Sequence, residues 1–499
     1  MESFTRKRAS NIENGYVPVL IIGAGATSIA MGYQLKVKLG FDQFRILERQ
    51  SGIGGCWWSN RYPGVAFRGP TASYSFSFAP NYVSPHLYPT GQEFQKYLQQ
   101  VADKYRLNPR IQLNTDVAEF RWIEEDAEWE AMLHHLVPGI GDISARDRQE
   151  RLARSGPGSV YIKKEKIRAR LVVTCAGFLV GPNPWPPSLP GRNTFKGEVF
   201  HTGRWRDDVD LDGKDVVVIG ACSAAQVVLS LLKESYYVKS LTQVMRRAPW
   251  VMPRLQEPFE KEKFARYAPT VLRYLPILGR LYGYGIHVLV ELIWLLLLHQ
   301  KHPKWRKAME KDTLERTRKL IPEKYHRMMT PDYPYGCKRR IFDSDWLESM
   351  NNSNFTLTNR KIVGVDEKHL KLGTPYTFNA DSEEDSEQQI LADVIILANG
   401  FEGTRWLHPI SVIGRDGPQV YMTVAVDGFP NFFMAIGPNS TNAIASLLLT
   451  VENITAYIAT MIKPVLKGDA ALVEVKKEAV REWTESIQQG LQATVFVDC

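Results

Sequence analysis

The chain has 499 residues, with 62 Lys and Arg residues against 54 Asp and Glu residues, so its formal net charge is +8. That length corresponds to roughly three domain-sized units. A hydrophobic fraction of 44% with 23% charged residues argues against long disordered stretches. The charge excess does not indicate a nucleic-acid partner and fits an anionic cofactor equally well. Five scattered cysteines without a CxxC pair indicate neither a disulfide framework nor a zinc site, so we expect no metal.

Residues 1–16 lack the apolar run of a secretory signal, so we expect a cytoplasmic protein. Residues 281–298, LYGYGIHVLVELIWLLLL, are about as long as the shortest spanning helix, but they contain His287 and Glu291. We expect a buried or surface-docked helix there, and peripheral membrane contact is the alternative left open.

Residues 17–48 have the pattern of a buried strand, a glycine turn, a helix and a second strand that ends at Glu48. Two further apolar runs, 216–219 and 394–397, also precede glycine turns. Strands that alternate with helices in this way predict an α/β fold built on parallel sheets.

Between these units lie less regular stretches. Residues 134–170 are polar and predict a hairpin with a surface loop, and residues 178–192 contain five prolines, typical of an extended linker. Residues 258–330 are helix-like and interrupt a Rossmann unit, so we expect a helical insertion over a cleft. Residues 380–389 are acidic and predict a surface loop.

The turn Gly23-Ala-Gly25-Ala-Thr-Ser28, followed by Glu48, is the strongest signal of function. The first glycine permits a tight turn, and the second lets the backbone approach a pyrophosphate at a helix N-terminus. Glu48 lies at the spacing where a carboxylate accepts a hydrogen bond from a ribose hydroxyl. Ser28 replaces the usual third glycine, where a small residue can be tolerated. The unit is therefore predicted to bind a dinucleotide.

A second turn begins at Gly220, again between a strand and a helix. Cys222 occupies the position that should approach the pyrophosphate, and Ala225 is an accepted third residue. The next strand ends on Arg246 and Arg247, which suit a ribose 2′-phosphate and favour NADP over NAD. A Rossmann unit whose nucleotide site has decayed is the other interpretation.

Five more segments carry motifs: GGCWWSNRYPGV at 54–65, FKGEVFHTGRW at 195–205, PDYPYGCKR at 331–339, NGF at 399–401, and GFPN through GPN at 428–439. Together they resemble the flavin-dependent Baeyer–Villiger monooxygenases, flavoproteins with two dinucleotide-binding domains. The second segment matches that family's FxGxxxHxxxW fingerprint. The resemblance covers nearly the whole chain.

The resemblance implies two Rossmann-like domains, a discontinuous FAD domain and an NADP-type domain, with a helical insertion. The expected boundaries are 1–177 and 391–499 for the two parts of the FAD-binding domain, 178–257 and 331–390 for the NADP-type domain, and 258–330 for the insertion.

The resemblance also implies the chemistry. NADPH would reduce FAD, the flavin would form a C4a-peroxide with O₂, and oxygen would be inserted beside a ketone to give an ester or lactone. Arg339 would be the catalytic cation, with Arg68 beside it, and His201 and Trp205 would lie at the hinge between the domains. The expected cofactor-binding residues are Gly23, Gly25, Ser28, Glu48, Arg49, Gly55, Trp57, Trp58, Tyr62, Gly220, Arg246, Lys338 and Asn439.

Several positions depart from the family pattern near the oxygen and nicotinamide sites. Phe67-Arg68 replaces a small residue and an Asp, Cys222 replaces a glycine, and Asn399 replaces a common Thr. A stretch ahead of the GFPN motif is also shorter, without the usual tryptophan. Two alternatives therefore stay open: a non-oxygenative flavoprotein that catalyses cyclisation or isomerisation, and an oxidase that takes hydride directly from its substrate.

The substrate is expected to be a small hydrophobic molecule of secondary metabolism, with O₂ as co-substrate, and no nucleic acid is expected as a partner. This expectation follows from the apolar 281–298 segment and from aromatic residues near the flavin motif: Trp57, Trp58, Tyr74, Phe76 and Phe78. The sequence does not choose among terpenoids, polyketides and steroids.

Overall fold

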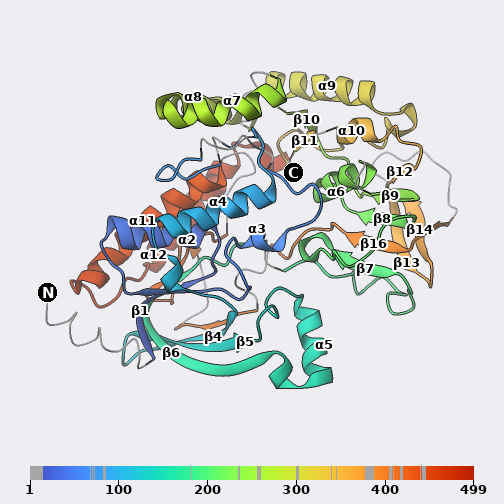
Figure 1. Cartoon of the computed structure of the whole chain (residues 1–499). Helices are drawn as coiled ribbons and strands as arrows, with labels where there is room; N and C mark the ends of the chain where they lie inside the picture. The colour runs from blue at the N-terminus through green and yellow to red at the C-terminus, as the bar shows by residue number, and fades with distance from the viewer. Residues whose placement is uncertain are drawn as a thin grey trace.

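A mixed ten-stranded sheet and a parallel five-stranded sheet organise the chain in the computed structural model (Figure 1). The chain passes from the first sheet to the second after Thr174 and returns after Leu397, and these two stretches are called the crossing segments. The structure describes residues 15–498 except 68, 70, 72–73, 82–85, 180, 234–235, 255–259, 299–302, 339, 344, 377–386, 404–406, 408, 416–419, 439 and 441–445. The predicted α/β class is confirmed.

The first sheet has ten strands, and its central strand, β1, pairs in parallel with β2 and β6. Alternate β1 residues face opposite sides: Val19 and Ile21 pack with the helices, and Leu20 and Ile22 pack under the β4–β5 hairpin. The strands are β1 (Tyr16–Ile22), β2 (Phe44–Leu47), β3 (Ile111–Gln112), β4 (Thr115–Ile123), β5 (Glu128–Leu136), β6 (Tyr161–Thr174), β17 (Ser411–Ile413), β18 (Val420–Tyr421), β19 (Ala425–Val426) and β20 (Phe432–Met434).

Helices α2, α4 and α11 cover one face of this sheet, and α11 packs directly on α2. The helices of this unit are α2 (Ala26–Tyr33), η2 (Gln34–Lys38), α3 (Cys56–Ser59), α4 (Gly91–Lys104), η4 (Asn108–Arg110), α5 (Ala145–Ser155), η5 (Pro157–Ser159), α11 (Leu447–Lys467), α12 (Lys477–Leu491) and η8 (Val495–Asp498). The hairpin expected over 134–170 is present, but its connection contains α5 where only a loop was expected. A Ser144–Asp147 capping box starts that helix.

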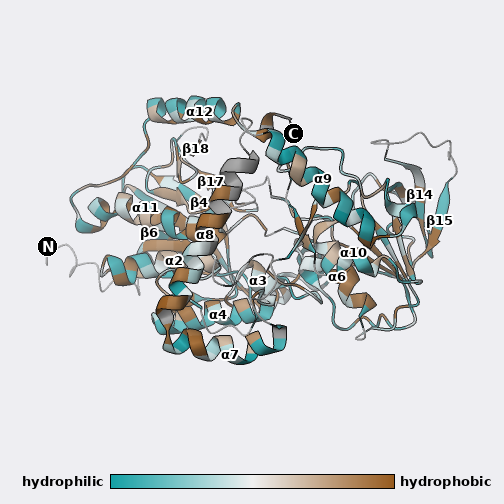
Figure 2. Cartoon of the chain, turned by 90° about the horizontal axis from the view of Figure 1, so that it is seen from above, coloured by the Kyte–Doolittle hydropathy of each residue, from teal (hydrophilic) through white to brown (hydrophobic). Residues whose placement is uncertain are grey.

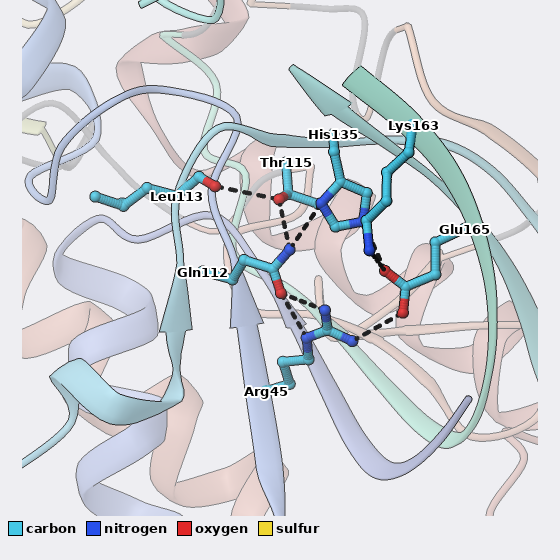
Figure 3. Close-up of polar contacts among 7 residues, drawn as sticks. All are labelled: Arg45, Gln112, Leu113, Thr115, His135, Lys163 and Glu165. Carbon is cyan, nitrogen blue, oxygen red and sulfur yellow. Dashed lines mark hydrogen bonds and ion pairs between the residues drawn. The ribbon is translucent and has the colours of Figure 1, made fainter. Parts of the chain in front are cut away.

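A polar cluster joins the β5–β6 hairpin to β2 and β3 (Figure 3). Glu165 accepts a hydrogen bond from His135 Nε2 at 2.6 Å, and its other oxygen lies 3.6 Å from Arg45. Gln112 connects Arg45 to Thr115. Burial raises the pKa of Glu165, but His135 and Arg45 outweigh it, so the pKa is lowered. Glu165 thus stays ionised near neutral pH, and the cluster ties five strands together.

The second sheet has five parallel strands in the order β12-β9-β8-β16-β7. Helices α6 and α10 cover one face, and a small antiparallel sheet, β13-β14-β15, covers the other. The elements are β7 (Glu198–His201), η6 (Thr202–Arg204), β8 (Asp215–Ile219), α6 (Cys222–Leu232), β9 (Ser240–Val244), α10 (Trp346–Ser349), β12 (Phe355–Thr358), β13 (Arg360–Val365), β14 (His369–Pro375), β15 (Gln388–Leu391) and β16 (Val394–Leu397).

A helical segment interrupts this second unit, and the strands on either side of it, β10 and β11, pair with each other. In Figure 1 its helices lie along the top of the molecule. Within the described residues, no helix is long and apolar enough to cross a membrane. The elements are β10 (Val251–Pro253), α7 (Lys261–Tyr274), α8 (Pro276–Leu298), α9 (Pro303–Leu320), η7 (Glu323–Tyr325) and β11 (Ile341–Asp343).

The cysteines depart in one respect from what their spacing indicated. Cys56, Cys175 and Cys222 are outside any disulfide bond, as scattered cysteines should be, but Cys337 is disulfide-bonded. The fifth cysteine, Cys499, lies outside the described residues. Sequence spacing could not reveal this bond, because pairing depends on which cysteines meet in space.

Candidate dinucleotide and active site

The first glycine turn follows β1 and leads into α2. Gly23 has φ +96°, and a Cβ there would lie 2.8 Å from the carbonyl oxygen of Cys175, so only glycine fits. Gly25 is the N-cap of α2, and its Cα lies 3.0 Å from where a Cβ on Gly55 would be. Two glycine segments therefore meet at a helix N-terminus, which leaves backbone exposed to a phosphate.

Ser28 and Glu48 both contact this turn. Ser28 is fully buried, and its hydroxyl donates a hydrogen bond to the carbonyl of Gly23, so the turn accommodates the missing third glycine. The Glu48 carboxylate accepts hydrogen bonds from the backbone N–H groups of Ala24 at 2.6 Å and Gln50 at 2.8 Å. Burial raises the pKa of Glu48, although these two hydrogen bonds oppose the shift.

The segment 54–65 runs from the first unit to the second, and α3 within it lies between the two sheets in Figure 1. Trp58 donates a hydrogen bond to Asp142 at 2.9 Å on the first unit's side. Tyr62 is buried in the core of the second unit, and its hydroxyl donates to Gln226 of α6 at 2.9 Å. Gly64 lies against the same helix. The segment thus connects the first glycine turn to the helix of the second.

Aromatic rings gather beside this segment. Trp57 stacks on Phe67 with 4.2 Å between ring centroids, and Phe67 also contacts Tyr74 at 4.4 Å and Phe94 at 4.5 Å. Phe67 is buried, whereas Trp57 and Tyr74 are half-buried. The departure at Phe67 therefore builds an apolar wall, part of which faces outward.

Three arginines converge next to the first turn, and the sequence motifs did not single out two of them. Burial and the charges of Arg49 and Arg148 lower the pKa of Arg204 to about 10, and burial and Arg49 also lower the pKa of Arg148. The Nε atoms of Arg49 and Arg204 are buried without a hydrogen-bond partner in the described structure. Asp142 partly offsets this charge. Such a cluster favours binding of an anion.

The second glycine turn has the expected geometry with one obstruction. Gly220 has φ +142°, and α6 begins directly at Cys222. Cys222 is half-buried and packs against the apolar core of the second unit. Its side chain thus lies partly against protein, although it still occupies the helix N-terminus that a pyrophosphate would approach.

Basic residues meet beyond β9. Burial lowers the pKa of Lys338, and the nearby charges of Arg247 and Arg246 lower it further, with Asp332 opposing. Arg247 Nε lies 3.2 Å from Asp332, while Arg246 is exposed. The Lys338 ammonium lies over the ring of Tyr333, 4.5 Å from its centroid. Lys338 and Arg246, which are 92 positions apart in the sequence, therefore lie near one another.

His201 lies where the chain crosses between the sheets. It is 7% exposed; its Nδ1 accepts from the Gly203 N–H, and its Nε2 donates to the Gly400 carbonyl at 2.9 Å. Asn183 of the proline-rich linker also donates its N–H to that carbonyl at 3.0 Å. Burial lowers the pKa of His201 to about 4. Trp205 packs edge-on against Phe200 nearby.

Three predicted residues, Arg68, Arg339 and Asn439, lie outside the described residues. Sequence reasoning missed Arg148, Arg204 and Gln226. Arg204 lies within the FKGEVFHTGRW motif and could have been found there, whereas Arg148 and Gln226 carry no signal of their own. No group of three His, Cys, Asp or Glu side chains that could hold a metal ion occurs in the described part of the chain.

Two family models match the chain. Residues 21–98 match the NAD(P)-binding Rossmann-like domain, and residues 149–269 match the flavin-binding monooxygenase-like family. A Baeyer–Villiger monooxygenase of Streptomyces coelicolor is 29% identical over 96% of this chain and 85% of its own length. One from Pseudomonas aeruginosa is 28% identical over 96% of this chain and 83% of its own.

Solved structures agree on the fold. Steroid monooxygenase bound to NADP is 25% identical with a TM-score of 0.72, covering 96% of this chain and 91% of its own. Cyclohexanone monooxygenase in its open crystal structure is 24% identical with a TM-score of 0.74, and the match covers 97% of this chain and 94% of that chain. The family resemblance indicated by the motifs is confirmed, and so is a fold of two dinucleotide-binding domains.

Proposed function

We propose that this chain, a flavoprotein monooxygenase related to the Baeyer–Villiger enzymes, uses NADPH and O₂ to insert one oxygen atom beside the carbonyl of a hydrophobic ketone. One observation carries the proposal. Segment 54–65 starts at the first glycine turn and docks Tyr62 and Gly64 on α6, at the second turn. Two dinucleotide sites therefore share one connecting segment, as hydride transfer between two cofactors requires.

The residues of the first turn fit FAD. Gly23, Gly25 and Gly55 leave room for a pyrophosphate, and Glu48 lies next to the turn. The arginine cluster of Arg49, Arg148 and Arg204 has buried donors that an anion would satisfy. FAD, once bound and reduced by NADPH, supplies the activated oxygen, and the protein's part is to position and to shield it.

The residues of the second turn fit NADPH, but the space for its pyrophosphate is smaller than at the first turn. Lys338, Arg246 and Arg247 gather positive charge at the end of β9, where a 2′-phosphate would bind. Cys222 narrows the approach to the N-terminus of α6. His201 and Trp205 are assigned a positioning role, because the two crossing segments meet at His201.

Arg339 is assigned the role of catalytic cation from its place in the PDYPYGCKR motif, and Arg68 is assigned a second catalytic role from its place after the YPGV segment. A guanidinium does not deprotonate near neutral pH, so it can stabilise the negative charge that develops on the substrate oxygen. Asn439 is assigned to the flavin on the same grounds. The aromatic wall of Trp57, Phe67 and Tyr74 beside segment 54–65 supports a hydrophobic substrate.

The decisive test is the visible spectrum of the FAD-loaded protein under anaerobic conditions, before and after addition of NADPH. We expect the oxidised-flavin band to disappear on NADPH addition. A band that persists would reject the NADPH-driven reaction. Bleaching of the flavin band by a candidate substrate alone would then indicate an oxidase. Conversion of the substrate to product without any bleaching of the band would indicate cyclisation or isomerisation. No feature of the described residues favours either alternative.

The role of Arg339 has a separate test. The Arg339→Ala variant should keep FAD and its reduction by NADPH but lose product formation, with the consumed O₂ released as hydrogen peroxide. Arg340→Ala, which removes the neighbouring cation, is the matched control. Normal product formation by Arg339→Ala would remove the catalytic assignment.

A further inference from the structure

Helices α7 and α8 expose a row of large apolar side chains. Six of them are between 54% and 77% exposed and define the α7–α8 apolar face: Tyr274, Leu275, Ile277, Leu281, Tyr284 and Val288. Figure 2 looks onto this side of the molecule, where brown segments of α7 and α8 lie toward the viewer. Single exposed leucines are ordinary, but a contiguous apolar patch marks an interaction surface.

The polarity of α8 is the reverse of that in an ordinary surface helix. Ile277, Leu281, Tyr284 and Val288 follow the helical repeat and point outward, whereas the buried positions between them are glycines, Gly279 and Gly283. The small residues therefore face the protein and the large apolar ones face away. Packing within this chain does not explain the arrangement.

The same region carries the protein's charge excess. Residues 258–330 contain 15 Lys and Arg residues and 7 Asp and Glu residues, a formal charge of +8 that equals the net charge of the whole chain. The rest of the chain is therefore balanced. Arg273 and Arg280 are exposed beside the apolar face, and Trp305 of α9 is 62% exposed. Exposed aromatic, aliphatic and basic residues together suit the interface of a bilayer.

We propose that the α7–α8 apolar face docks into the surface of a bilayer that contains anionic phospholipids, with α8 lying in the plane of the interface. The apolar side chains enter the boundary between headgroups and acyl chains, and the basic side chains meet lipid phosphates. The proposal does not rest on the catalytic assignment, because it uses only exposed residues of the insertion.

The test is co-sedimentation of the full FAD-loaded chain with vesicles of phosphatidylcholine alone or of phosphatidylcholine mixed with phosphatidylserine. We expect binding to the mixed vesicles and its loss in high salt. Leu281→Glu should weaken binding about tenfold or more, since it removes an apolar side chain that would enter the bilayer and adds a charge that anionic lipids repel. Ile162→Glu, at an equally exposed apolar position on β6, is the control and should bind normally.

A second variant, Arg273→Gln/Arg280→Gln, should weaken binding about fivefold per arginine. Flavin content and NADPH-dependent bleaching of each variant in solution show that it is folded. Equal binding to both vesicle types, or binding that Leu281→Glu leaves intact, overturns the proposal. So does a dimer in sedimentation velocity that Leu281→Glu dissociates without any vesicle binding, because the face would then be a contact between copies.

Discussion

At Arg204 the fold brings together charges that repel one another. Arg49 and Arg148 lie close enough to lower the pKa of its guanidinium, and burial lowers it further. The lowered pKa means that the charged guanidinium is less favourable in the folded protein than in the unfolded chain. Because Arg204 is charged in both states at neutral pH, it destabilises the protein without a ligand. A bound phosphate would reverse the effect.

We therefore expect Arg204→Gln to have opposite effects on the two states of the protein. The apoprotein should gain about 2 °C in Tm, because a repelled buried charge is removed. Affinity for FAD should fall about tenfold, because an anion loses a charged donor. Thermal melts of the apoprotein and a fluorescence titration with FAD measure both quantities.

Arg206→Gln is the matched control, since Arg206 lies two positions away on the surface and is paired with Glu198 and Asp208. It should change neither FAD affinity nor apoprotein Tm appreciably. Unchanged FAD affinity in Arg204→Gln would show that the arginine cluster serves another purpose.

Cys222 offers a gain-of-function prediction at a single side chain. It occupies the N-terminus of α6, where the family pattern has glycine. Cys222→Gly should lower the Kd for NADPH about tenfold, because backbone N–H groups become accessible to the pyrophosphate. A stopped-flow titration of flavin reduction against NADPH concentration measures it, and Cys222→Ser, which removes the thiol but keeps a side chain of similar size, is the control. An unchanged Kd would mean that the thiol is already accommodated.

At the scale of elements, the contact between segment 54–65 and α6 is the least expected feature. Gly64 has φ +77°, and a Cβ there would lie 2.7 Å from the Gln226 carbonyl and would also strike Ser230. Nothing in the local sequence predicts this contact, because its partners lie more than 150 positions apart in the chain.

Gly64→Ala should therefore push this segment away from α6 and slow NADPH-driven flavin reduction, while FAD stays bound. Gly213→Ala isolates the cause, since Gly213 has a similar φ of +70° but open space around it. Both variants should lose about 1–3 kcal/mol of stability from the unfavourable φ. Only Gly64→Ala should slow reduction, as measured by anaerobic stopped flow. Equal reduction rates would show that the contact is structural.

The features that the sequence alone predicts are those that depend on neighbouring residues in the chain. The strand at 216–219 and the turns at Gly23 and Gly220 were predictable, because unbroken apolar runs and positive-φ glycines are local signals. Helix α5 was missed because its sequence is polar on all sides and only its capping box marks its start. For α8 the apolar run left a buried, a surface-docked and a membrane-contacting helix open, and its outward face is decided only by the burial of Gly279 and Gly283 in the fold.

At the scale of the whole molecule, both chain crossings between the two sheets run side by side. Pro182 and Phe401 form a β-bridge, and the Gly400 carbonyl accepts hydrogen bonds from Asn183 and His201. His201 ends β7, directly opposite Leu397 at the end of β16. One neutral imidazole thus holds the two crossing segments together.

This arrangement predicts an acid-sensitive connection. The folded pKa of His201 is about 4, below its ordinary value of about 6.5. As pH falls through 6.5 the unfolded chain takes up a proton that the folded chain excludes, so stability is lost between pH 6.5 and 4. At pH 5 the loss is about 2 kcal/mol relative to pH 7.

His201→Gln can still donate a hydrogen bond to the Gly400 carbonyl but cannot titrate, so the free energy of unfolding of this variant should change less over this pH range. Urea unfolding at both pH values measures the difference, with His369→Gln, a half-buried histidine of the same unit that contacts Asp366, as the control. If wild type and His201→Gln lose equal stability between pH 7 and pH 5, His201 is not the acid-sensitive group.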